Sequence, residues 1–126
     1  MLGEAVGSDR CSIIQELENS NVIYIPTEWS CPGIVTTLET NSEMESLMVW
    51  DNFASFHECY ARGEVANFLV ADIEEPARSI LASQGCTSLL IVPIMVQGKC
   101  WGEIGFDNCG ESRLYDEAEI AILRIA

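Results

Sequence analysis

The sequence has few positive charges. Only 6 of its 126 residues are lysine or arginine, against 20 aspartates and glutamates, which gives a net charge of −14 at pH 7. Such a chain repels the phosphates of nucleic acids and the headgroups of anionic membranes. The composition therefore argues against nucleic-acid binding and against membrane contact by this domain. We expect the charge to keep the surface soluble and self-repelling.

The sequence also lacks a long apolar run. A bilayer span needs roughly 20 apolar residues, and the longest run here, 89–96, contains Pro93 and has the length of a strand. The first residues, Met-Leu-Gly-Glu, lack the basic and apolar regions of a signal peptide. We therefore expect a cytoplasmic protein.

Clustered metal ligands and catalytic groups are missing as well. The chain has no CxxC, and His57 is its only histidine, whereas structural zinc sites usually use closely spaced ligand pairs. Cys59 is two residues from His57, so on a helix the two would point to different faces. Neither GxxxxGK[ST] nor GxGxxG occurs. We predict no metal site, no enzyme activity for this chain and six reduced cysteines that mostly pack in the core.

The hydrophobic pattern predicts one α+β domain over 1–126. Hydrophobic residues make up 48% of the chain, enough for one core. Strands are predicted over 11–17, 22–25, 65–70, 88–97 and 99–107, with an extended stretch at 34–37 inside a loop over 29–40. Helices are predicted over 44–60, with a break near Asp51-Asn52, over 77–83, and from 115 onwards. Residues 1–6 read as a helix end, and both termini look cut within helices.

The two predicted hairpins favour an antiparallel sheet, and the order of the helices favours helical layers on both of its faces. The strand 88–97 is apolar at both its odd and its even positions. We expect it to be covered on both sides.

The C-terminal half contains a series of short motifs: Gly63-Glu64-Val65, Asp72-Ile73, Ser79-Ile80-Leu81, Gln84-Gly85, Ser88 to Ile94, Trp101 to Cys109, and Tyr115 to Leu123. Together these segments resemble GAF domains, especially those that accompany PAS domains in bacterial and archaeal sensor histidine kinases. The resemblance covers 53–126 well, 1–25 moderately and 26–42 weakly. It implies a GAF-like (profilin-like) antiparallel sheet with helices on both faces, and a homodimer formed through the terminal helices.

The resemblance also implies a ligand pocket between the sheet and the middle helices. The candidate lining residues are mostly aromatic: Trp50, Phe53, Phe56, His57, Tyr60, Phe68, Asp72, Trp101 and Glu103. The alternative is that most of them are ordinary core. Glu103 stands where the related domains often have Phe, so it needs a partner or a polar ligand if it faces inward.

The sequence leaves the cofactor unknown, with covalent bilin disfavoured and haem still open. Some GAF domains bind cyclic nucleotides, but a phosphate prefers basic groups, and these are scarce here. Related bilin-binding domains attach the bilin to a Cys on the helix after the Asp-containing strand, and the matching segment 74–85 has none. Haem would need His57 or Cys59 as its axial ligand, although a lone His on an apolar helix is more often a packed residue.

The resemblance implies a sensory module of a signal-transduction protein. It would bind an unknown small molecule or relay a signal to flanking PAS and histidine kinase domains of a two-component phosphorelay. A ligand that binds better to one arrangement of the terminal helices would increase the population of that arrangement. The alternatives are a ligand-free dimerisation spacer and a free-standing reductase like the methionine-sulfoxide reductases of this fold, which need accessible cysteines that lie close together.

Overall fold

The computed structural model describes residues 7–18, 20–34 and 47–125. The predicted helix end over 1–6, most of the extended stretch at 34–37 and the helix start near Asn41 lie outside the described residues. Within the described part, the elements follow one another along the chain as strands and helices with these bounds: β1 (Arg10–Glu16), β2 (Ile23–Ser30), the 3-10 turn η1 (Trp50–Asn52), α4 (Ala54–Arg62), β3 (Ala66–Leu69), the 3-10 turn η2 (Val70–Asp72), α5 (Ala77–Ser83), β4 (Ser88–Val96), β5 (Lys99–Asn108) and α6 (Glu117–Ile125).

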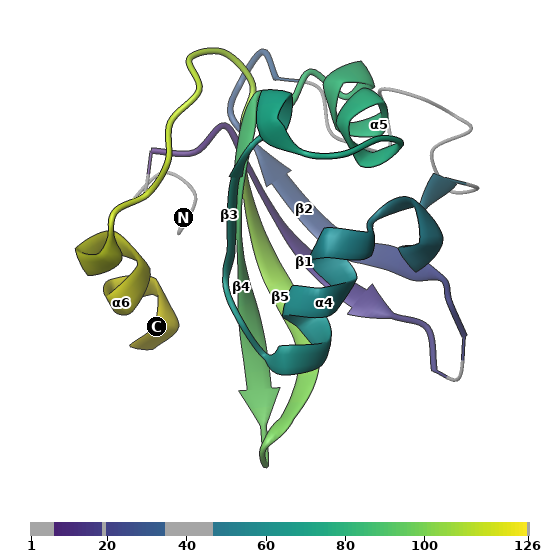
Figure 1. The fold of residues 1–126 in the computed structure, drawn as a ribbon. Helices are drawn as coiled ribbons and strands as arrows, with labels where there is room; N and C mark the ends of the chain where they lie inside the picture. Colours follow the sequence, from purple (N-terminus) through teal and green to yellow (C-terminus); the bar gives the residue numbers. More distant parts are fainter. Residues whose placement is uncertain (1–6, 19, 35–46, 126) are drawn as a thin grey trace.

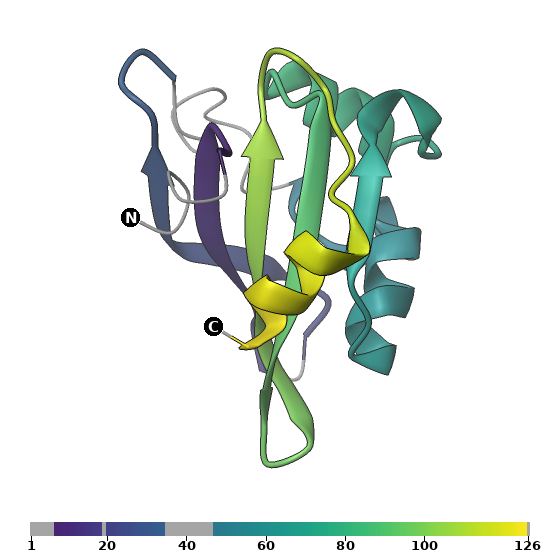
Figure 2. The ribbon, with the colours of Figure 1, turned by 90° about the vertical axis from the view of Figure 1, so that its left-hand side faces the viewer.

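The strands form one antiparallel sheet in the order β2-β1-β5-β4-β3. Both predicted hairpins are present, and the pairing of β1 with β5 joins them into one sheet. Helices α4 and α5 cover one face and α6 covers the other (Figures 1 and 2). The predicted α+β fold with helices on both faces is therefore confirmed. None of the helices in the described ranges is both long enough and apolar enough to cross a bilayer.

Each face of the sheet carries its own core. The side chains of Leu89 and Ile91 belong to the core under α4 and α5. Their neighbours Leu90 and Val92 belong to the core under α6, together with residues such as Phe106. Because successive side chains of a strand point to opposite faces, β4 contributes to both cores, as its two apolar faces predicted.

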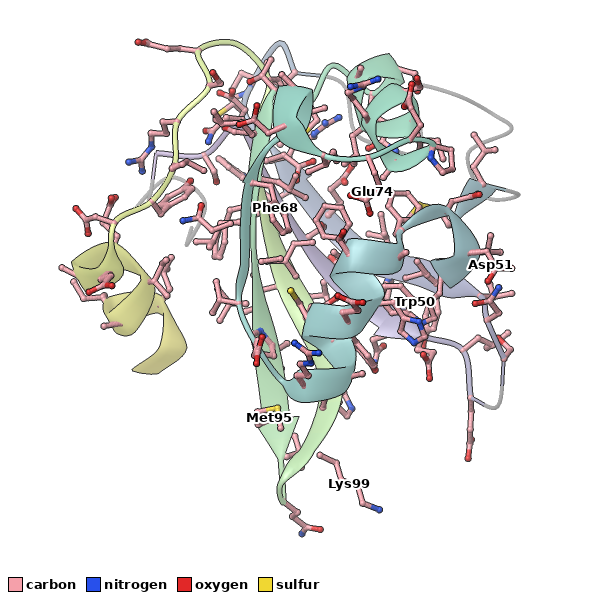
Figure 3. All side chains as sticks on the ribbon, viewed as in Figure 1. Trp50, Asp51, Phe68, Glu74, Met95 and Lys99 are labelled. Atoms are coloured by element: carbon pink, nitrogen blue, oxygen red, sulfur yellow. The ribbon has the colours of Figure 1, made fainter. Side chains whose placement is uncertain are left out.

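The coverage of β4 stops before its end. Met95 and Val96 are each 49% exposed, and so is Trp101 on β5. Figure 3 shows Met95 and Lys99 on the part of the hairpin that extends past α4. The expectation that 88–97 is covered along its whole length is therefore wrong for the hairpin tip, which reaches beyond the helices.

The long helix predicted over 44–60 is interrupted earlier than expected. Val49 forms an antiparallel bridge with Val22, and the Ile23 backbone N–H donates to the Met48 carbonyl at 2.9 Å. These bonds hold 48–49 in an extended conformation, so α4 begins only at Ala54. It ends as predicted at Gly63, whose φ of 66° is left-handed.

Strand β2 is longer than predicted and runs through Pro26 to Ser30. Proline cannot donate to a sheet ladder, but β2 is an edge strand, where one missing donor is tolerated. The register with β1 shifts between Ile13 and Gln15, opposite the segment that contains Pro26. The residues predicted as loop from Trp29 onwards therefore begin inside a strand.

Candidate ligand cavity

A cavity of about 60 Å³ lies between the sheet and the elements that cover it on the α4 side. Its floor comes from β1, β2, β4 and β5, and its roof comes from η1, α4, α5 and the residues next to them. The lining is mostly apolar and consists of Ile14, Ile23, Ile25, Met48, Trp50, Phe53, Phe56, Leu81, Leu89 and Ile91, with Ser12, Gln84 and Asp107 as its polar members.

Three of the nine candidate residues line this cavity. Trp50, Phe53 and Phe56 are 4%, 6% and 3% exposed, respectively. Phe68 on β3 packs edge-on against Phe56, with ring centroids 5.3 Å apart and an interplanar angle of 87°. It therefore supports the cavity wall from behind and does not form it.

His57 and Tyr60 lie on the other side of Trp50. The His57 ring stacks on Trp50 at a centroid distance of 4.7 Å and an angle of 7°, while Tyr60 lies at 5.1 Å. The Trp50 indole N–H donates to the Glu16 carboxylate. Figure 3 shows Trp50 beside α4. This cluster fastens α4 and η1 to β1, and burial raises the pKa of Tyr60 to about 12.

Asp72 and Trp101 lie away from the cavity. Asp72 is exposed at the end of η2, and Trp101 is on the exposed hairpin. The family resemblance had suggested both residues as candidates for the pocket lining. Their position relative to the cavity depends on the path of η2 and on the reach of the β4–β5 hairpin beyond α4.

Glu103 faces inward but lies under α4, outside the cavity lining. It is 1% exposed, and its Oε2 has no hydrogen-bond partner among the described residues. Burial raises its pKa to about 8. Cys59 and Tyr60 of α4, and Cys100 of β5, are the titratable groups on which its charge acts. At neutral pH it is therefore mainly a neutral acid.

The polar residues Ser12 and Asp107 of the cavity could not be found from residue types alone. Asp107 on β5 pairs with Arg10 on β1 at 3.2 Å, and Arg10 is 1% exposed. Burial raises the Asp107 pKa to about 6, although Arg10 lowers it. Ser12 lies two residues along β1 from Arg10. Only the register of β1 against β5 brings these side chains together.

Glu74 positions the roof. Its carboxylate accepts hydrogen bonds from the Ser55 backbone N–H at 3.2 Å and from the Ser55 hydroxyl at 2.6 Å, which lowers its pKa. An acidic group at a helix N-terminus is favourable, and α4 has no side-chain cap of its own at Phe53. The segment that leads into α5 is thereby tied to the start of α4 (Figure 3).

The residues around the cavity do not fit a haem. His57 is exposed and stacked on Trp50, and neither it nor Cys59 lines the cavity. Burial raises the Cys59 pKa, which disfavours a thiolate ligand. The described residues contain no group of three or more His, Cys, Asp or Glu side chains placed to hold a metal ion.

The cysteines are less buried than predicted. All six are free thiols, but Cys86 alone is buried and the other five are half-buried. Cys11 lies in β1 and Cys109 directly follows β5, and both are half-buried, whereas the buried Cys86 precedes β4. Burial raises the pKa of each of these three thiols, so all are protonated at neutral pH.

Comparison with known proteins places this fold. The chain is 38% identical over 128 residues to the methanogenesis regulatory histidine kinase FilI of Methanothrix harundinacea, a match that covers the whole chain but 14% of that protein. The GAF3 domain of Slr1393 from Synechocystis aligns with a TM-score of 0.81 at 15% identity, covering 97% of this chain and 78% of that one. A domain of a putative two-component sensor histidine kinase from Sinorhizobium meliloti aligns with a TM-score of 0.66 at 14% identity, covering 98% and 76%.

The two structural likenesses have low sequence identity and establish the fold alone. The family model describing the GAF domain matches residues 1–126. The sheet order, the helices on both faces and this match agree with the resemblance found in the sequence, and the chain belongs to the GAF domain family.

Proposed function

We propose that this domain is a sensory module, in which the cavity binds a small molecule and the sheet relays binding to α6. The observation that supports it most is the double use of β4. Leu89 and Ile91 line the cavity, while Leu90 and Val92 pack under α6 on the opposite face. A displacement of the strand by a ligand would therefore act directly on the packing of α6.

A second contact connects the α4 side to α6. Asn67 on β3 donates from Nδ2 to the Tyr115 carbonyl at 2.9 Å and accepts from the Tyr115 backbone N–H at 3.3 Å. Its neighbour Phe68 packs against Phe56 of the cavity wall. Adjacent residues of one strand thus contact the cavity wall and the segment that leads into α6.

The wider context is part of the proposal. The chain spans 14% of the length of the histidine kinase FilI. That relative supports the proposal that this domain serves in a cytoplasmic sensor kinase with flanking domains. A ligand would then change the populations of the arrangements of α6, and this change would be passed to a two-component phosphorelay. No kinase chemistry is assigned to this chain itself.

The small cavity favours a second candidate, a dimerisation spacer without a ligand. About 60 Å³ is little space for a metabolite. In addition, Leu114 before α6 and Ile122 within it are 52% and 68% exposed, respectively. In this alternative, α6 would pair with a second copy and no ligand would act on it.

Amide chemical shifts of the chain during titration with n-propanol would distinguish the two. The sensory proposal expects shifts at Ile23 and Leu89 in the cavity wall and, at the same midpoint, in α6. The variant Ile25→Phe, which fills the cavity, should abolish both sets. Ile13→Phe is the matched control, because Ile13 is also half-buried but lies away from this cavity, and it should bind as the unaltered chain does.

Shifts confined to the cavity would defeat the relay to α6. If Ile25→Phe and Ile13→Phe changed the titration equally, the cavity would not be the binding site, and the spacer would be the better description.

A further inference from the structure

Two of the three polar residues of the cavity, Ser12 and Asp107, are neighbours in the sheet. Arg10 is opposite Asp107 and Ser12 is opposite Gly105 in the pairing of β1 with β5. Ser12 and Asp107 are therefore diagonal neighbours on one face of the sheet, within reach of a single small ligand. Gln84 comes from the end of α5 at the same cavity. The other lining residues are apolar.

Ser12 and Asp107 have capacity to bind a ligand. Ser12 is 7% exposed and lines the cavity. Its hydroxyl can both donate and accept a hydrogen bond. A carboxylate has about four acceptor positions, and Arg10 contacts Asp107 through Oδ2. Both groups can accept a hydrogen bond from a donor inside the cavity.

The charges around Ser12 and Asp107 disfavour an anion. No lysine or arginine of the described residues lines the cavity. Arg10 is the nearby buried cation, and it pairs with Asp107 at 3.2 Å. Glu28 adds negative potential at the Asp107 carboxyl. A carboxylate or phosphate in the cavity would therefore be repelled by Asp107 and Glu28, while the nearby cation, Arg10, already pairs with Asp107.

We propose that the ligand has a short apolar body and an uncharged or cationic head that donates hydrogen bonds to Asp107 and Ser12. Alcohols and protonated amines have this chemistry, and carboxylates and phosphate esters do not. The inference rests on the proposed function, since it names the class of molecule that the same cavity takes. The small volume limits the body to a few carbon atoms unless the roof moves.

Three probes with a three-carbon body test the head group: n-propanol, n-propylamine and propionate. Each is titrated into the unaltered chain at pH 7.5, and binding is followed by the chemical shifts of the backbone amides that line the cavity. Hydrogen bonds to charged groups favour the amine by about tenfold or more over propionate. Tighter or equal binding of propionate would overturn the inference while leaving the cavity as the site. Failure of all three to bind would overturn the proposed function, and the inference with it.

Variants identify the contacts. Ser12→Ala should weaken n-propanol binding by about threefold to tenfold, and Asp107→Asn should remove most of the preference for the amine. Asp72→Asn is the matched control, because Asp72 is exposed and lies away from the cavity, and its affinities should stay within about twofold. Asp107→Asn also removes the carboxylate that Arg10 contacts. If that variant fails to fold, the probe series and Ser12→Ala carry the test. Unchanged binding of all three probes to Ser12→Ala would remove Ser12 from the site.

Discussion

At the scale of single residues, Glu103 makes folding sensitive to pH. Its pKa rises from an ordinary 4.5 to about 8 because it is buried. Below pH 4.5 it is protonated in both states. As the pH rises towards 8, the unfolded chain releases the proton and the folded chain keeps it, so the free energy of unfolding decreases. At pH 7, about 2.5 units above the ordinary value, the loss is about 3 kcal/mol.

We expect Glu103→Gln to remove this loss, because glutamine keeps the shape and cannot ionise. Urea unfolding between pH 4.5 and 8 should show a higher free energy of unfolding for the variant at pH 7, by up to about 3 kcal/mol, and little difference near pH 4.5. Glu111→Gln is the control, since Glu111 is exposed. Equal pH slopes for Glu103→Gln and the unaltered chain would show that Glu103 ionises as an ordinary acid.

The sequence left the direction of Glu103 open, and it is the register of the sheet that turns the side chain inward. The alternation of β5 alone does not say which of its faces α4 covers. Ser12 and Asp107 were missed for the same reason, because residues that lie 95 positions apart become neighbours only when β1 pairs with β5. The aromatic residues Trp50, Phe53 and Phe56 were easier to identify, since large side chains at helical spacing seek a core.

At the scale of elements, β1 and β5 approach closely at Gly102. A Cβ added there would lie 2.8 Å from the Ile14 carbonyl oxygen, a backbone atom that cannot move aside without shifting β1. We expect Gly102→Ala to reduce the free energy of unfolding by about 1–3 kcal/mol, as overpacking typically does. Thermal or urea unfolding would measure it.

Gly110→Ala is the matched control, since a Cβ there meets nothing within 4 Å. It should change stability by less than about 0.5 kcal/mol. A similar loss in both variants would indicate that glycine flexibility, and not the contact with Ile14, is the cause.

The segment before α6 is held by Asn67. Asn67→Ala removes both hydrogen bonds to the Tyr115 backbone, and we expect it to lower stability by about 1–3 kcal/mol and to speed hydrogen exchange in α6 more than in α5. Asn21→Ala serves as the control, because the Asn21 side chain is exposed. Unchanged exchange in α6 would show that the apolar contacts of Leu123 and Tyr115 suffice to hold it.

The element bounds were predictable where the signal is local. Helix α5 was predicted over its observed residues, and the turn Gln97-Gly98 correctly separated β4 from β5. The segment 44–60 has a helical pattern throughout, yet 48–49 join the edge of β2. This pairing depends on the edge of β2, about 25 residues earlier in the chain. The hydrophobic periodicity of 44–60 carries no information about it.

At the scale of the whole molecule, the fold class followed from the two hairpins and the flanking helices, while the net charge of −14 sets how the molecule responds to salt. Few ion pairs lie at the surface of the described part of the chain. Arg78–Glu75, at 3.5 Å, is one of them, and because such pairs are exposed they contribute little stability. Repulsion among the remaining acids acts over about 10 Å at 0.1 M salt and over about 30 Å at 0.01 M.

We therefore expect the melting temperature to rise when NaCl is increased from about 10 mM to about 500 mM, because screening relieves repulsion in the folded state more than in the expanded unfolded chain. Differential scanning calorimetry at pH 7.5 would measure the shift, with KCl as a check that ionic strength and not the cation is responsible. The same repulsion opposes self-association, so sedimentation at the two NaCl concentrations would measure its effect on association. A melting temperature that falls with salt would mean that attractive pairs such as Arg113–Glu119, at 3.1 Å, outweigh the repulsion among the excess acids.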